Sequence, residues 1–263
     1  MATANVNGMD MYYEVHGDGP AIVFAHGVGG NHASWYQQVP FFSRYYKVIT
    51  VDQRGFGRSE DVNGLGRGAF VSDVKELLDQ LGIGETCLVA QSMGGSTCMG
   101  FTTSYPERVS ALVMADTLAG ITMPEPLKTQ QQQNAEATRD LSQLERVVGK
   151  GFPERNPAMA ELYLEVASFN KSNENRFNMS GSMPPIQITF DQVKSAAEKV
   201  PMLFLVGEND ILQPAAIVGA ASKMVPNAQL AIVPDAGHSC YWEQPDIFNY
   251  QVHRFLSDAL LHE

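Results

Sequence analysis

The chain of 263 residues carries 18 Lys and Arg against 29 Asp and Glu, which gives a formal net charge of −11. With 44% hydrophobic and 18% charged residues, its composition is that of a globular protein and excludes a disordered or fibrous chain. Basic residues are not clustered, which argues against binding to nucleic acid or to an anionic membrane, because phosphate contacts require concentrated cations.

The sequence also indicates where the protein resides. No run approaches 18 consecutive apolar residues, and the first residues lack a basic region followed by an apolar stretch, so we expect neither a membrane span nor a secretory signal. The three cysteines, Cys87, Cys98 and Cys240, form no C-x-x-C pair and are expected to be buried thiols in a reducing compartment. A cytoplasmic location is therefore expected.

Strand and helix patterns alternate through the first half of the chain. The dipeptide Asn7-Gly8 predicts a tight hairpin turn, and continuous apolar runs predict buried strands over residues 21–25, 47–51, 86–90 and 111–115. Helical patterns cover about residues 34–44, 70–81 and 94–105. This alternation predicts a parallel sheet covered by helices on both faces.

The alternation breaks between residues 118 and 200 and then resumes. The interrupted stretch is rich in Gln, Asn, Glu and Met, and helical patterns fit about residues 126–148, 157–170 and 190–199. Strands at 202–206 and 229–233 and helices at 215–224 and 241–261 follow. We therefore expect a core formed by residues 1–117 and 201–263, with a helical cap inserted at 118–200.

The strongest local motif is VAQSMGG at residues 89–95, between a predicted strand and a predicted helix. A sharp turn of this kind exposes Ser92 at the carboxyl edge of the sheet, and the small residues Ala90 and Gly94 relieve crowding around it. The alternative is that Ser92 only caps the helix.

A serine nucleophile needs a base, and the base needs an acid that orients it. Asp210 follows the predicted strand at 202–206, and His238 follows the one at 229–233. Both are then at the edge of the sheet where Ser92 is expected, in the order Ser, Asp, His. Glu208 and Asp116 are rival acids, and Asp210 could merely cap the next helix.

The segment HGVGG at residues 26–30 follows another buried strand. Acyl transfer develops an oxyanion, which backbone N–H groups stabilise. We assign this role to the N–H groups of Val28 and Met93, with His26 bracing the loop. Such a loop could instead hold a phosphate, but it lacks the Lys-Ser/Thr pair and the G-x-G-x-x-G spacing of nucleotide sites.

Four segments together resemble the α/β-hydrolase fold superfamily: HGVGG at 26–30, DQRGFGRS at 52–59, the motif around Ser92, and Gly237-His238 with Glu243 and Pro245 after it. The resemblance implies an eight-stranded, mostly parallel sheet with a helical cap after the sixth strand. It also implies that residues 52–59 form a structural loop beside the active site. A serine nucleophile separates the chain from the haloalkane dehalogenases and epoxide hydrolases of this fold, which use Asp.

The expected activity is hydrolysis of a small, apolar carboxylic ester or lactone through an acyl-enzyme, without cofactor or metal, by a monomer or homodimer. A C–C bond hydrolase of aromatic meta-cleavage products is the main alternative. Such enzymes resemble this chain but usually carry Gly-Pro-Gly where residues 28–30 read Val-Gly-Gly. A cofactor-free oxygenase and a ligand receptor on the same fold also remain open.

Overall fold

The computed structural model describes residues 2–170 and 181–261 and contains one eight-stranded sheet. Strands β1, β2 and β4 pair antiparallel, whereas the pairs from β4 through β10 are parallel. In spatial order the strands are β1 (Ala2–Val6), β2 (Met9–His16), β4 (Lys47–Val51), β3 (Ala21–Ala25), β5 (Thr86–Gln91), β6 (Val109–Ala115), β9 (Met202–Gly207) and β10 (Gln229–Val233). The predicted sheet is confirmed.

The sheet separates two hydrophobic cores because neighbouring side chains of a strand point to opposite faces. In β3, Val23 packs into one core, whereas Ile22 and Phe24 pack into the other. The same division holds in β5, where Leu88 and Val89 belong to different cores. Strands buried on both faces explain the continuous apolar runs of the sequence.

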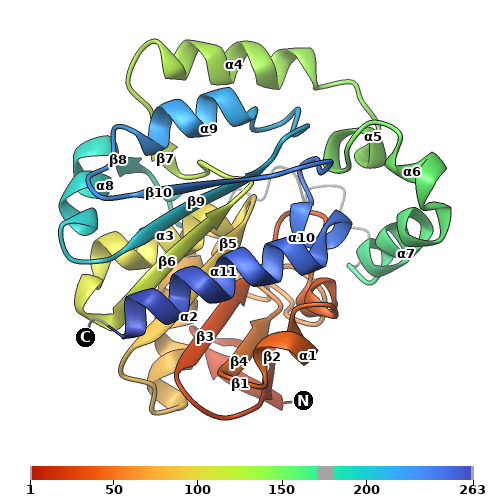
Figure 1. Ribbon diagram of the computed structural model, residues 1–263. Coiled ribbons are helices and arrows are strands. Elements are labelled where there is room, and N and C mark those ends of the chain that lie inside the picture. Colours follow the sequence, from red (N-terminus) through yellow and green to blue (C-terminus); the bar gives the residue numbers. More distant parts are fainter. Residues whose placement is uncertain (1, 171–180, 262–263) are drawn as a thin grey trace.

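Helices cover both faces of this sheet (Figure 1). One core is closed by α2 (Phe70–Gln80), α3 (Gly94–Ser104), α8 (Phe190–Ala197) and α9 (Ala215–Ser222). The other is closed by α1 (Val39–Phe42), α10 (Cys240–Glu243) and α11 (Pro245–Leu260). Short 3₁₀ turns, η1 (His32–Trp35), η2 (Gly66–Ala69) and η3 (Pro106–Arg108), complete the connections.

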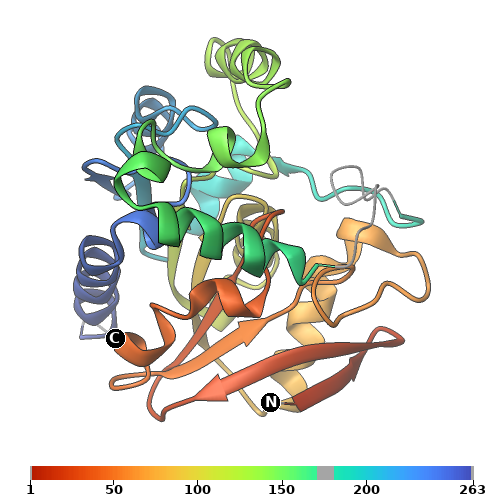
Figure 2. The ribbon, with the colours of Figure 1, turned by 90° about the vertical axis from the view of Figure 1, so that its right-hand side faces the viewer.

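A helical insertion follows β6, as the resemblance implied. Its helices are α4 (Leu127–Ala137), α5 (Gln143–Val147), α6 (Phe152–Arg155) and α7 (Pro157–Ser168), drawn in green in Figures 1 and 2. The single helix predicted over 126–148 is wrong, because Ser142 and Glu145 form a capping box that begins α5 as a separate helix. A short parallel pair, β7 (Ile121–Thr122) with β8 (Ile188–Thr189), was not predicted.

Three further expectations concern the cysteines, the last predicted helix and membrane spans. All three cysteines are buried, as predicted. The last predicted helix, 241–261, is divided in two, because Pro245 occupies the first turn of α11 and α10 ends just before it. Within residues 2–170 and 181–261, no helix combines the length and apolar character that crossing a bilayer requires.

Candidate active site

Ser92 lies in the sharp turn between β5 and α3. Its φ angle is +49°, in the left-handed region that residues with a Cβ atom rarely adopt. The turn also brings α3 close to β3, since a Cβ atom at position 94 would collide with the carbonyl oxygen of Ala25. The glycine at position 94 is therefore a steric requirement of the turn, as the motif suggested.

The structure brings Ser92, His238 and Asp210 together. His238 Nε2 lies 2.8 Å from Ser92 Oγ, and His238 Nδ1 lies 2.9 Å from Asp210 Oδ2. Asp210 and His238 are both buried. Three side chains that are as much as 146 positions apart thus form one hydrogen-bonded chain, which starts at a hydroxyl and ends at a carboxylate.

The three candidate acids occupy different positions. Asp210 contacts the imidazole, and its Oδ1 also accepts the backbone N–H groups of Leu212 and Gln213. Glu208 is exposed and lies 3.4 Å from the backbone nitrogen of Asp235. Asp116 is fully buried, but its oxygens accept the backbone N–H groups of residues 207 and 240 rather than the imidazole. Asp210 is therefore the carboxylate placed to orient His238.

Burial and charge oppose each other at His238. Burial alone would lower its pKa, but the negative charge and hydrogen bond of Asp210, with a smaller effect of Asp116, raise the pKa above the ordinary value of 6.5. Burial and the neighbouring Asp210 charge raise the pKa of Asp116 to about 7. The site therefore favours a protonated imidazole more strongly than water does.

The loop after β3 lies beside Ser92. Neither the N–H of Val28 nor that of Met93 donates a hydrogen bond to another described residue. His26 is fully buried; it pairs through Nδ1 with the Gly27 carbonyl, 2.7 Å away, and accepts the backbone N–H of Gln53 at Nε2. Burial lowers the pKa of His26 to about 4, so it stays neutral and can accept this bond.

Ser92 and His238 open into a cavity of about 340 Å³ beneath the inserted helices. The core contributes residues from the loop after β3, the end of β5 and the loops after β9 and β10. The insertion contributes Leu141, residues of α5 and one residue of α7. The lining residues are Val28, Gly29, Gln91, Ser92, Leu141, Gln143, Arg146, Val147, Tyr163, Leu212 and His238.

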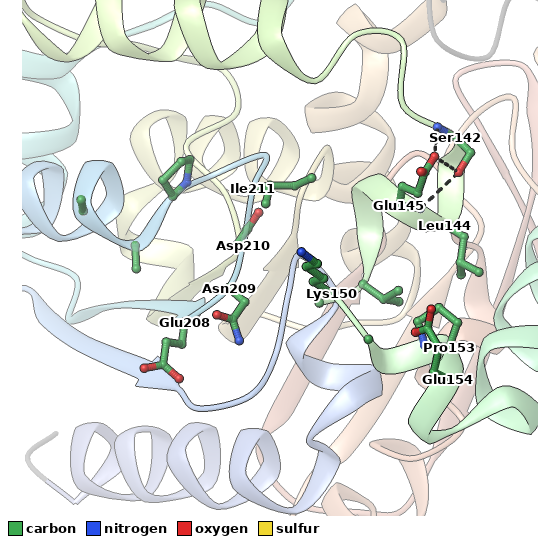
Figure 3. A pocket seen from close by; sticks show the side chains of 16 residues that line it. Ser142, Leu144, Glu145, Lys150, Pro153, Glu154, Glu208, Asn209, Asp210 and Ile211 are labelled. Atoms are coloured by element: carbon green, nitrogen blue, oxygen red, sulfur yellow. Dashed lines mark hydrogen bonds between the residues drawn. The ribbon is translucent and has the colours of Figure 1, made fainter.

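A second, larger cavity of about 880 Å³ lies on the other side of α5 (Figure 3). It contains Asp210 but neither Ser92 nor His238, so it is not where the hydroxyl is exposed. Helix α5 separates the two cavities: Gln143 and Val147 face the smaller one, whereas Leu144 and Val148 face the larger.

Three residues of the site were not predicted from the sequence to have a role there. Gln91 donates through Nε2 to the carbonyl of His238 at 2.7 Å, and Arg146 lines the cavity. Glu243 accepts the backbone N–H of Gly237 at 2.8 Å, next to His238. Gln91 adjoins the nucleophile, which was a usable signal, whereas the position of Arg146 depends on the orientation of a cap helix.

No described group of three or more His, Cys, Asp or Glu side chains is arranged to hold a metal ion. The described site brings together a hydroxyl, an imidazole and a carboxylate, with backbone N–H groups beside them. A hydroxyl bonded to an imidazole that is bonded to a buried carboxylate is an arrangement suited to nucleophilic attack on a carbonyl carbon.

Comparison with known proteins shows the family to which this chain belongs. A family model described as the alpha/beta hydrolase fold matches residues 20–245, and the chain belongs to that family. A relative from Burkholderia vietnamiensis, a 2-hydroxy-6-oxononadienedioate/2-hydroxy-6-oxononatrienedioate hydrolase, is 29% identical over 94% of this chain and 90% of its own.

Two solved structures cover almost the whole chain. A thermophilic esterase from Thermogutta terrifontis superposes with a TM-score of 0.81 at 24% identity, covering 98% of each chain. An enzyme that degrades N-acyl homoserine lactones superposes with a TM-score of 0.79 at 25% identity, covering 96% of this chain and 99% of its own. Hydrolysis is the activity that family membership supports.

Proposed function

We propose that the protein is a serine hydrolase that cleaves a carboxylic ester or a lactone through an acyl-enzyme. The observation that carries the proposal is the hydrogen-bonded chain from Ser92 Oγ through His238 to Asp210, beside a cavity of about 340 Å³. The similarity to the homoserine lactone-degrading enzyme supports an ester or lactone as the substrate.

In the first half of the reaction, Ser92 Oγ attacks the substrate carbonyl carbon while His238 Nε2 takes the hydroxyl proton. Asp210 accepts a hydrogen bond from the Nδ1–H group of His238 and so stabilises the imidazolium. The carbonyl oxygen becomes an oxyanion near the N–H groups of Val28 and Met93, which have no competing acceptor among the described residues.

The tetrahedral intermediate then collapses and the C–O bond to the alcohol breaks. His238 returns its proton to the departing alkoxide, which leaves as an alcohol or, from a lactone, stays attached to the acyl chain. A water molecule, deprotonated by His238, attacks the acyl-enzyme in the second half. The products are a carboxylic acid and regenerated Ser92.

The test is the hydrolysis of p-nitrophenyl butyrate and of a set of lactones by the wild type and Ser92→Ala. Because the hydroxyl, imidazole and carboxylate act as a unit, we expect kcat to fall by about 10³-fold or more in the variant. Ser104→Ala, an exposed serine at the end of α3, is the matched control and should retain wild-type activity. Ester and lactone hydrolysis that persists in Ser92→Ala would refute the proposal.

A second candidate is the hydrolysis of a C–C bond in a dienoate product of aromatic ring cleavage. It is favoured by the name of the Burkholderia vietnamiensis relative. The loop after β3 argues against it, because the Gly-Pro-Gly usual in such enzymes is replaced by Val-Gly-Gly. Adding a dienoate ring-fission product to the assay separates the two: Ser92-dependent cleavage of this compound alone would favour the second candidate.

A further inference from the structure

The small cavity beside Ser92 contains one permanently charged side chain among its described lining residues, that of Arg146. Arg146 belongs to α5 and lies three positions after Gln143, so the two side chains share one face of the helix. The other ionisable groups of the described lining are His238 and the Tyr163 hydroxyl, and no described carboxylate lines this cavity.

The guanidinium of Arg146 is incompletely paired. Its Nε is buried and has no hydrogen-bond partner, and no ion pair joins Arg146 to a described carboxylate. Leaving a buried guanidinium donor unpaired costs free energy, and arginine is among the side chains that are least often buried without a partner. Arg146 also lines the cavity without a described anionic partner, so the structure favours a counter-charge that arrives with the ligand.

The neighbouring carboxylates are already engaged elsewhere. Glu145, the adjacent residue, accepts the backbone N–H and hydroxyl of Ser142 in the capping box and faces the larger cavity. Asp210 is bonded to His238 and two backbone N–H groups. Glu243 accepts the backbone N–H groups of residues 149 and 237. None of them is free to pair with Arg146.

Other arginines of the chain show what a satisfied guanidinium looks like. Arg54 is fully buried and binds Asp73 through two nitrogens, at 2.7 and 2.8 Å. Even the exposed Arg139, on the same insertion as Arg146, pairs with Glu136. Arg146 thus differs from both, because it lines the substrate cavity without a described anionic partner.

We propose that Arg146 binds a carboxylate carried by the substrate, so that the molecule cleaved at Ser92 is an anionic ester or lactone, such as the half-ester of a short dicarboxylic acid. This inference rests on the proposed function and names its substrate class. It modifies the expectation of a purely apolar substrate: Val28, Leu141, Val147 and Leu212 contact the apolar part, and the guanidinium holds the acid.

The chemistry of the two groups supports this pairing. A guanidinium presents its N–H donors in a planar fork that matches the two oxygens of a carboxylate. Away from bulk water, such a charge-assisted pair also fixes the position of the ligand, which would align its ester carbonyl with Ser92. The positive charge of Arg146 also acts on the base, because it lowers the pKa of His238.

The experiment compares matched ester pairs that differ in one terminal group. Monomethyl glutarate and methyl pentanoate share a five-carbon acyl chain that ends in a carboxylate or a methyl group. A second pair, 3-acetoxypropanoate and propyl acetate, places the carboxylate on the alcohol side. The acid released is titrated at constant pH with the wild type, Arg146→Gln, Arg146→Lys and the control Arg139→Gln.

We expect the wild type to prefer the anionic member of at least one pair. Arg146→Gln should lower kcat/KM for that ester about 10- to 100-fold while changing the neutral ester by less than about threefold, because only the anionic ester loses a charged hydrogen bond. Arg146→Lys should restore part of the preference, since it keeps the charge but not the fork. Arg139→Gln should change neither ester.

Two outcomes overturn the inference while leaving the proposed function intact: no preference for an anionic ester in the wild type, or an equal loss on both members of the preferred pair in Arg146→Gln. If none of these four esters is hydrolysed, the assay with p-nitrophenyl butyrate and lactones still decides the proposed function, and a binding measurement decides the role of Arg146. Glutarate is then titrated calorimetrically into Ser92→Ala and into Ser92→Ala/Arg146→Gln. Binding to the first protein alone supports the inference, and equal or absent binding overturns it.

Discussion

Glu243, in the last turn before α11, accepts a hydrogen bond from the backbone N–H of Gly149, in the insertion, at 2.8 Å. Its other carboxylate oxygen accepts the N–H of Gly237, the residue before His238. One carboxylate thus joins the insertion to the loop that carries the imidazole. Burial raises the pKa of Glu243 to about 7, although both hydrogen bonds act to lower it.

Replacing Glu243 with Gln tests this connection. A Gln side chain has one carbonyl oxygen and directs its NH₂ group at the second N–H, so we expect a loss of about 1–3 kcal/mol in the free energy of unfolding, measured by urea denaturation. The exposed Glu161 of α7 provides the control, and Glu161→Gln should change stability by less than about 0.5 kcal/mol.

The effect of Glu243→Gln should also depend on pH. The folded state raises the pKa of Glu243 from 4.5 to about 7, so this group's favourable contribution is complete below about pH 4.5 and is lost as the pH rises through about 7. The difference in free energy of unfolding between wild type and variant should therefore narrow between these pH values. A difference that widens as the pH rises would contradict the assignment.

The pH dependence of turnover follows from the environment of His238. His238 must be neutral to take the Ser92 proton, so kcat/KM falls as the pH decreases through its pKa. Burial acts to lower this pKa, but Asp210 and Asp116 raise it, and the acidic limb should lie above pH 6.5. Initial rates of p-nitrophenyl butyrate hydrolysis between pH 5 and 9 measure it.

Two variants test which carboxylate raises the pKa of His238 and so moves the acidic limb of kcat/KM. Asp116→Asn removes a charge that does not touch the imidazole, so the limb should move to lower pH. Asp210→Asn should move it in the same direction and also reduce kcat by about 10³-fold or more, because the imidazole loses its orienting acceptor. A wild-type limb at or below pH 6.5 would show that burial outweighs the two carboxylates.

The strained backbone at Ser92 predicts a difference between two inactive variants. At a φ of +49° a Cβ atom costs free energy that glycine avoids, so we expect Ser92→Gly to be more stable than Ser92→Ala by about 1 kcal/mol. Both variants lack Oγ and therefore lose the same hydrogen bond to His238. Equal urea midpoints, or a more stable alanine variant, would show that the turn carries no strain.

The parts of the fold that the sequence predicted are those that local patterns determine. Buried strands such as 21–25 and 47–51 have the predicted limits because both faces are covered by helices and each apolar run ends at a polar residue, His26 or Asp52, that follows the strand. The hairpin at Asn7-Gly8 follows from two residues that tolerate positive φ. The β7–β8 pair was missed because two residues per strand leave no periodic pattern.

The residues of the site also fall into those whose role local sequence patterns could predict and those whose role they could not. Ser92, Asp210 and His238 could be found because parallel strands deliver their following residues to one edge of the sheet. Arg146 and Glu243 could not, because their roles depend on how the insertion packs over that edge. Arg146 lies on a five-residue helix whose orientation no local pattern determines, and Glu243 binds a backbone group 94 positions away.

The insertion starts and finishes at neighbouring points, since Ile121 and Thr122 lie beside Ile188 and Thr189 in the β7–β8 pair. Its two ends therefore lie side by side, and a replacement segment of another length can begin and end at this pair without a change in the register of the large sheet. Such a segment would also have to supply the N–H donor that Gly149 gives to Glu243, because this contact reaches the loop that carries His238.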